Sequence, residues 1–336
     1  MSKWYQGEGN NADVVLYSGI RLSRNLADTP FPSRMSSEIR KNCCKKIFAA
    51  VKSSPLAGEF DMINLAELTD AQAAAYAEKR LISKDFLKLK NKASFMLSKQ
   101  EDVSVMLCEE DHIQITAYAP GESLQEAYRK ADRLDDIFID TLKLAFSERL
   151  GFLTASPINL GTGMHASYVL HLPALKQAGA LYRLSSMVAK LGLSLREMFR
   201  HGAGDLYVLS NQVTLGISEQ SAIDNITAIA DQIVKQERAE REAMKQHFDF
   251  EDKIYRALGV LQSARRLDSR EFLEMLSLVR LGAAMHYLDV DYKTVGDMLY
   301  TMQNASLVAT ADKELTEEEC AKLRAQLIRE KLEKMK

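Results

Sequence analysis

The sequence predicts an α+β fold in which an antiparallel sheet flanked by helices is followed by a C-terminal all-helical domain. Two observations support this prediction. In the first part of the chain, short apolar runs of strand length follow one another with few polar residues between them, as in an antiparallel meander. From about Ser218 onward, long charged segments with helical spacing take their place, for example residues 233–246. We expect a boundary near residue 250, between a mixed domain over 1–250 and a helical domain over 251–336.

The individual elements follow from the spacing of apolar residues. Short runs of apolar residues, some alternating with polar ones, predict strands over 14–22, 94–97, 103–107 and 113–115, and a strand pair over 206–209 and 212–215. Helical spacing predicts helices over 35–51, 70–81, 124–150 and 174–191. Because hairpins or single helices join most strands, a regular alternation of strand and helix is not expected.

The last helix has a clear beginning. Thr316 and Glu319 form a capping box, in which each side chain satisfies a backbone N–H group of the other residue. After it, an apolar stripe predicts docking on the helical domain, or else on a second subunit. The stripe consists of Cys320, Leu323, Leu327, Leu332 and Met335.

Composition limits the classes of function. The 336 residues carry a formal net charge of -2, which gives no general attraction for nucleic acid or an anionic membrane. No positively charged leader precedes an apolar stretch and no run is long enough for a membrane span, so we expect a cytoplasmic protein. The four cysteines include the adjacent Cys43 and Cys44, which is typical of reduced thiols rather than of a disulfide framework or a metal site.

Four segments, in order, resemble the ATP:guanidino phosphotransferases, or phosphagen kinases, and most of all their bacterial protein-arginine-kinase branch. The segments are YSGIRLSRNL from Tyr17, CEEDHIQI from Cys108, GFLTASPINLGTGMHASYVLHLP from Gly151 and REMFRHGAGDLYVLSNQVTLG from Arg196. The resemblance implies a catalytic domain over 1–250 that transfers the ATP γ-phosphoryl group to arginine side chains of proteins, with Mg²⁺ as cofactor. It also implies a protein substrate, a homodimer, a zinc-binding activator and an unfoldase–protease system as partners.

Transfer of a phosphoryl group needs cations that hold the polyphosphate and offset the charge of the transition state. By the resemblance, Arg21 and Arg196 stand at phosphate-binding positions. Gly19, Gln114 and His165 stand where the family has arginines. An imidazole with the reference pKa of about 6.5 would be only partly charged at neutral pH. Two further arginines could replace the missing cations or could be solvated side chains. They are Arg80, which by the resemblance stands at a position of nucleotide contact, and Arg200.

The resemblance also assigns the groups that face the guanidinium. Glu110 matches the catalytic carboxylate, and Glu109 matches a neighbour that organises Mg²⁺ through water. His201 stands in place of a second carboxylate, and Ser156 in place of a cysteine that can carry negative charge. Ile158 replaces a threonine.

Two further segments allow alternative interpretations. The turn Gly161-Thr162-Gly163 could bring backbone N–H groups to an anion, or could be an ordinary turn. In the helical tail, residues 320–325 stand where the family has a phosphoarginine-receptor motif, and Arg324 alone is retained. A single arginine there is more typical of a solvated side chain than of a receptor.

These substitutions predict impaired catalysis. One preorganised donor is worth roughly 10²- to 10³-fold in rate, and a phosphoryl-transfer arginine roughly 10³- to 10⁵-fold. The chain is therefore predicted to be either a protein-arginine kinase with weak turnover or a pseudokinase scaffold that binds a partner in protein quality control. A small-molecule guanidino kinase is less favoured, because the sequence shows no large helical N-terminal domain.

Overall fold

The chain folds around an eight-stranded antiparallel sheet, as seen in a computed structural model that describes residues 3–247 and 249–333. The strand order is β2-β3-β4-β5-β1-β8-β10-β9. The strands are β1 (Val15–Arg24), β2 (Phe60–Asn64), β3 (Ser94–Ser98), β4 (Val103–Leu107), β5 (Ile113–Pro120), β8 (Met164–His171), β9 (Leu193–Glu197) and β10 (Leu206–Asn211). A separate hairpin pairs β6 (Phe146–Ser147) with β7 (Gly151–Phe152).

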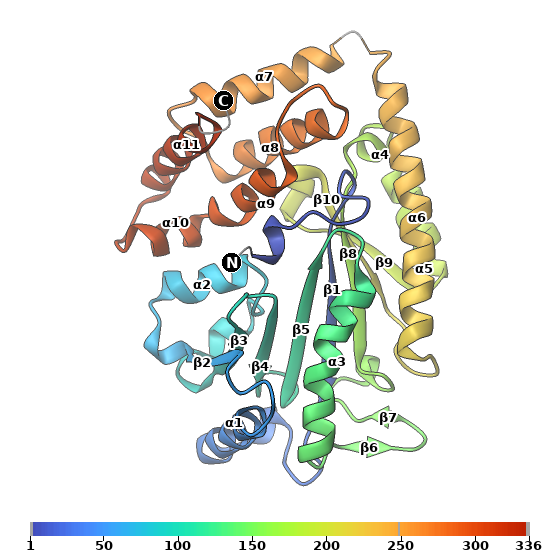
Figure 1. Cartoon of the computed structure of the whole chain (residues 1–336), viewed down its shortest axis with the longest axis vertical. Coiled ribbons are helices and arrows are strands. Elements are labelled where there is room, and N and C mark those ends of the chain that lie inside the picture. The colour runs from blue at the N-terminus through green and yellow to red at the C-terminus, as the bar shows by residue number, and fades with distance from the viewer. Residues whose placement is uncertain (1–2, 248, 334–336) are drawn as a thin grey trace.

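Helices cover one face of this sheet and form the C-terminal part of the chain (Figure 1). The helices before the tail are α1 (Ser37–Lys52), α3 (Leu124–Thr141), α4 (Pro173–Gln177), α5 (Leu181–Lys190) and α6 (Glu219–Met244), together with α2 (Asp70–Glu78), which packs against the tail on the side of the other face. The tail is α7 (Phe250–Ser263), α8 (Ser269–Ala284), α9 (Tyr292–Thr301), α10 (Asn304–Ala311) and α11 (Glu317–Glu333). The predicted fold class is therefore confirmed.

Alternation along the strands gives the sheet one apolar face and one mixed face. On β1, Ile20 and Leu22 are buried in a core that includes residues of α1, α3, α5 and α6. Gly19 and Arg21 point to the other side, because successive side chains of a strand lie on opposite faces. Figure 1 shows α3 lying across β1 and β5. The mixed face is thus left free of these helices.

Three predicted elements differ from the structure. The helix expected over 124–150 ends at Thr141, because residues 143–145 exchange backbone hydrogen bonds with residues 25–27. The helix expected over 174–191 is split near Gly179, which has a φ of 68°. The strand expected over 212–215 is absent from the described residues, because Asn211 donates side-chain hydrogen bonds to the carbonyls of Met164 and Val213 and ends β10. On the side away from β8, β10 pairs instead with β9, which lies earlier in the chain.

A second core joins the mixed face of the sheet to the helical tail. Trp4, in the short helix η1 (Trp4–Gln6), packs against Tyr118 of β5 and Tyr300 of α9, with ring centroids 4.5 and 5.1 Å apart. Phe272 of α8 and Val169 of β8 belong to the same core. Since this core is continuous, it does not divide the chain, and the boundary near residue 250 stays a prediction.

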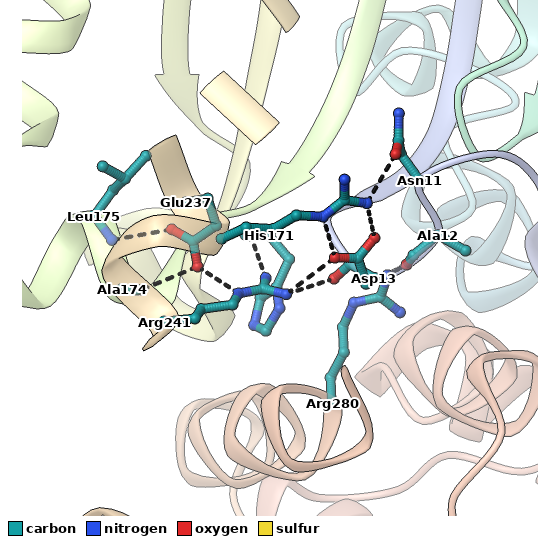
Figure 2. Close-up of polar contacts among 10 residues, drawn as sticks. Asn11, Ala12, Asp13, His171, Ala174, Leu175, Glu237, Arg241 and Arg280 are labelled. Carbon is teal, nitrogen blue, oxygen red and sulfur yellow. Dashed lines mark hydrogen bonds and ion pairs between the residues drawn. The ribbon is translucent and has the colours of Figure 1, made fainter. Parts of the chain in front are cut away.

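Buried charges hold the N-terminal segment between the sheet and two helices (Figure 2). Arg241 of α6 donates from Nε to Glu237 at 2.8 Å and from Nη2 to the His171 carbonyl at 3.1 Å. Arg280 of α8 donates from Nη2 to the carbonyl of Ala12 at 2.5 Å. Burial lowers the pKa of Arg280 to about 10, so its guanidinium is still charged at neutral pH. The network therefore fixes the N-terminal segment against both α6 and α8.

The predicted capping box of the last helix is confirmed. The Thr316 N–H group donates to Glu319 at 2.8 Å, and the Glu319 N–H group donates to the Thr316 hydroxyl at 3.2 Å. Cys320 and Leu332 are buried in the second core, so this part of the apolar stripe docks within the chain. Met335, the last member of the stripe, lies outside the described residues.

Candidate active site

A cavity of about 980 Å³ lies on the mixed face of the sheet. Its floor is formed by rows of side chains that cross neighbouring strands. One row places Gly19 of β1 between Ser167 of β8 and Tyr118 of β5. The next places Arg21 between His165 and Thr116. Of the predicted site residues, those that line this cleft are Gly19, Arg21, Arg80, Glu110, Gln114, Ser156, His165 and Arg196.

The acidic segment after β4 is held by its two buried members. Asp111 accepts hydrogen bonds from Asn25 Nδ2 at 2.6 Å and from the Ala155 N–H group at 2.8 Å. The Nδ1 atom of His112 accepts a hydrogen bond from the Leu26 N–H group at 2.8 Å. These contacts tie the segment to the end of β1 and to the loop that carries Ser156. The segment is therefore anchored and does not behave as a free surface turn.

The two glutamates that precede Asp111 differ in position. Glu110 lines the cleft, and burial, followed by the charges of Asp111 and Glu109, raises the pKa of its carboxyl group. Glu109 accepts the Ser83 hydroxyl at 3.0 Å and the Glu110 N–H group at 3.1 Å, and it does not line the cleft. Glu110 is thus the carboxylate that can reach a guanidinium. Glu109 is a half-buried neighbour with little freedom to move.

Of the arginines that line the cleft, Arg21 and Arg196 stand at the predicted phosphate-binding positions and present unpaired charge. Arg21 has a buried Nε atom without a hydrogen-bond partner, which fits an anion that would accept from it. Arg196 lies exposed at the end of β9, across from Val208 of β10. Neither forms an ion pair with a carboxylate in the part of the chain that the structure describes. Both are available to bind phosphate oxygens in a bidentate manner.

His165 does not supply the charge of the arginine that it replaces. Burial, then the nearby charges of Arg21 and Arg196, lower the pKa of its imidazole to about 4. Its Nε2 atom lies 2.7 Å from Asn159 Oδ1, and its Nδ1 atom lies 3.2 Å from the carbonyl of Asn211. The ring is therefore neutral at pH 7 and is held by two asparagines. The expectation of a partial charge there is wrong.

Ser156 and Ile158 both line the cleft, and Ile158 is 71% exposed. His201 and Arg200 lie on η6 (Arg200–Asp205), are exposed to solvent and do not line the cleft. Among the residues predicted to face a guanidinium, Glu110 is the carboxylate that lines the cleft. Glu78 also lines the cleft, but its carboxylate accepts hydrogen bonds from the N–H groups of Ala305 and Ser306.

The glycines of the 161–163 turn are explained by packing. A Cβ atom on Gly161 would lie 2.2 Å from the Thr214 carbonyl oxygen, and one on Gly163 would lie 2.7 Å from that of Ser23. The N–H group of Thr162 already donates to Thr214 at 3.0 Å, and Arg24 Nη1 donates to the Thr162 carbonyl at 2.9 Å. These contacts favour an ordinary packed turn over an anion cradle.

Arg324 in the tail is a structural residue and is not solvated. It is 1% exposed. Its Nε and Nη1 atoms donate to the carbonyls of Met302 and Leu267, each at 2.7 Å, and its Nη2 atom donates to Ser269 at 3.1 Å and to Asn304. With four hydrogen bonds inside the fold, this guanidinium has little capacity left for phosphoarginine. The expectation of a solvated side chain is therefore wrong.

Among the described residues, no group of three or more His, Cys, Asp or Glu side chains is placed to hold a metal ion. Mg²⁺ prefers to keep several waters and to bind through substrate phosphates, so the cleft fits an ion that arrives with a nucleotide and meets Glu110.

Several cleft residues were missed by sequence reasoning. Tyr118, Ser167, Ser194 and Ser210 form part of the floor, with the hydroxyls of Ser194 and Ser210 3.0 Å apart. None of these four residues lies within a predicted strand, because β8 and β9 were not predicted and β5 and β10 extend beyond the predicted ranges. Asn159 and Asn211, which hold His165, could not be paired with it from sequence.

The antiparallel sheet with a basic cleft on one face is the arrangement expected of a phosphotransferase. The chain belongs to the ATP:guanido phosphotransferase family, whose C-terminal catalytic domain matches residues 42–240. Residues 247–336 match the C-terminal domain of protein-arginine kinase McsB. The family prediction is therefore confirmed.

Two relatives are similar in sequence to this chain over nearly its full length. The chain is 38% identical to a protein-arginine kinase of Clostridium acetobutylicum, with 99% of this chain and 100% of the relative aligned. It is 37% identical to a protein-arginine kinase of Geobacillus stearothermophilus, with 99% and 94% aligned. The chain is thus similar throughout to protein-arginine kinases.

Solved structures share the fold. The duplicated taurocyamine kinase from Schistosoma mansoni with bound transition-state-analogue components has a TM-score of 0.64 at 22% identity, covering 78% of this chain and 39% of that chain. Lombricine kinase has a TM-score of 0.60 at 19% identity, covering 71% and 70%. This chain therefore corresponds to about two-fifths of the duplicated enzyme.

Membrane insertion through a helix has no support in the described part of the chain, where each helix is either too short or too polar to cross a bilayer.

Proposed function

We propose that this protein binds ATP with Mg²⁺ in the cleft and transfers the γ-phosphoryl group to arginine side chains of proteins with strongly impaired turnover. The observation that carries the proposal is the state of His165. The position where the family has a phosphate-binding arginine holds a neutral imidazole, although Arg21 and Arg196 persist on both sides of it.

The retained residues support binding and orientation. Arg21 and Arg196 bind phosphate oxygens through their planar forks. Mg²⁺, when bound, would neutralise part of the phosphate charge. Glu110 orients the substrate guanidinium, and its raised pKa favours uptake of the proton that this group releases.

The missing residues affect the transition state more than binding. Gly19, Gln114 and His165 remove three positive charges from the cleft, and Ser156 cannot carry the negative charge of a thiolate. One phosphoryl-transfer arginine is worth roughly 10³- to 10⁵-fold in rate. Because such losses are not additive, we expect a low but Glu110-dependent rate.

The second candidate is a pseudokinase scaffold that binds nucleotide and a partner protein without transfer. His201 favours it, because this exposed imidazole stands in place of a carboxylate and leaves Glu110 as the predicted guanidinium-binding carboxylate on the cleft wall. Its partners would be those implied by the family: a second copy of the chain, a zinc-binding activator and an unfoldase–protease system in the cytoplasm.

Radiolabelled MgATP and an arginine-rich protein substrate test the two candidates. We expect acid-labile phosphoarginine to form slowly in the wild type and to be lost in Glu110→Ala. A wild type equal to Glu110→Ala, with MgATP still raising the melting temperature, would support the pseudokinase scaffold. Turnover that is unchanged when His165→Arg and Gln114→Arg are introduced would contradict the proposed impairment.

A further inference from the structure

Helix α2 ends in an unusual way. Arg80 has a φ of 60°, in the left-handed region. Its N–H group donates to the Ala77 carbonyl at 3.0 Å, and the Leu81 N–H group donates to that of Tyr76 at 3.0 Å. These two bonds form a Schellman motif, in which glycine usually takes the place of Arg80. A side chain with a Cβ atom strains this position, and strain of this kind collects at functional sites.

The guanidinium of Arg80 enters the cleft with few partners. Its one hydrogen bond within the described chain is a long contact of 3.5 Å from Nη2 to the Met198 carbonyl, and no carboxylate pairs with it there. The surrounding side chains are aromatic: Tyr17, Tyr118 and Tyr300. A half-buried cation without an anion beside it fits an anionic ligand in the cavity.

Tyr118 fixes this arrangement. Its hydroxyl donates to the Arg80 carbonyl at 2.7 Å, and its ring stacks on Trp4. Gly19 lies next to it on β1, where a Cβ atom would be 3.1 Å from the Tyr118 ring and 3.0 Å from the Ser167 hydroxyl. The ring therefore occupies the space in which a side chain at position 19 would begin.

We propose that Arg80 binds phosphate oxygens of the nucleotide in place of the cation missing at position 19, and that Tyr118 is the positioning residue that directs Arg80 into the cleft. Gly19, Tyr118 and Arg80 thus form one unit: the absent side chain at position 19 leaves space for the Tyr118 ring, and the Tyr118 hydroxyl holds the backbone of the strained arginine. This inference rests on the proposed binding of MgATP. It does not depend on phosphoryl transfer.

The test is calorimetric titration of MgATP, and of magnesium tripolyphosphate as a probe for the phosphates alone. Arg80→Gly should weaken both affinities roughly 10- to 100-fold, the range for hydrogen bonds to charged groups. Tyr118→Phe, which removes only the hydroxyl, should weaken them roughly 5-fold. The double variant should match Arg80→Gly, because Tyr118 acts through Arg80.

Two controls separate binding from folding. Tyr168→Phe removes another buried tyrosine hydroxyl, which lies 2.9 Å from the Thr227 hydroxyl and does not line the cleft. This variant should leave the affinity unchanged. Arg200→Ala removes an exposed arginine near the cleft and should do the same. Ligand-free Arg80→Gly should melt at or above the wild-type temperature, because glycine suits the left-handed position.

Two results would overturn the inference. If Arg80→Gly binds as tightly as wild type while Arg21→Met does not, the Arg80 site is wrong and the proposed nucleotide cleft stands. If the wild type binds neither probe, the proposed function fails and the site fails with it. If the losses of affinity caused by Tyr118→Phe and Arg80→Gly add fully in the double variant, Tyr118 does not act through Arg80 and its positioning role is wrong.

Discussion

The neutral state of His165 can be tested through the pH dependence of stability. The unfolded imidazole has a pKa of about 6.5, and burial next to Arg21 lowers the folded value to about 4. Between these values the unfolded chain binds more protons than the folded one. Stability therefore falls as the pH drops from about 6.5 toward 4.

The magnitude follows from linkage. At pH 7 the unfolded ring is about one-quarter protonated and the difference is small, about 0.2 kcal/mol. At pH 5 the unfolded ring is almost fully protonated and the folded ring is about one-tenth protonated, which costs about 2 kcal/mol. The wild type should thus lose about 2 kcal/mol between pH 7 and pH 5 because of this one residue.

His165→Gln isolates this contribution, because glutamine can still bond to Asn159 and Asn211 but does not titrate. His112 and His171 also have lowered pKa values through burial, and they titrate equally in both proteins. Urea unfolding of the two proteins at pH 7, 6 and 5 should show stabilities that diverge in favour of the variant as the pH falls. Parallel pH profiles would show that the imidazole has an ordinary pKa and can act as a cation in the cleft.

Three structural substitutions give further predictions. Arg324→Met should lower the free energy of unfolding by about 3 kcal/mol and leave MgATP affinity unchanged, because its partners are backbone carbonyls of the tail; loss of phosphoarginine binding at unchanged stability would contradict this. Gly163→Ala should cost about 2 kcal/mol in urea unfolding, since φ is 60° and the Cβ atom meets the Ser23 carbonyl; a neutral effect would show that the turn is loosely packed. Arg241→Met should lower the free energy of unfolding by about 3–5 kcal/mol, because it leaves Glu237 buried without a cation. Arg238→Met, at an exposed neighbouring position, should lower it much less, and equal losses would argue against the buried network.

The sequence was sufficient where local chemistry decides the outcome. The meander from Ser94 to Ile115 and the capping box at Thr316 depend on residues close together in the chain, and both were predicted correctly. The family resemblance located the cleft, because four separate segments contribute to it.

Contacts between distant segments account for the rest. The segment after Thr141 pairs with residues 25–27, which helical spacing could not reveal. The position of the His165 ring depends on asparagines 6 and 46 residues away in the chain, and the burial of Arg324 depends on the loop before α8. The direction of Arg80 depends on Tyr118, whose role only the strand register makes visible.

The most direct test of the account is phosphotransfer from MgATP to an arginine-rich protein by three forms of the chain: wild type, Glu110→Ala, and a variant with Gln114→Arg, His165→Arg and His201→Glu together. Gly19 is left unchanged, because Tyr118 and Ser167 leave little space for a side chain there. We expect a low wild-type rate, loss of activity in Glu110→Ala and an increase of roughly 10²-fold or more in the restored variant. A wild-type rate as high as that of the restored variant would contradict it.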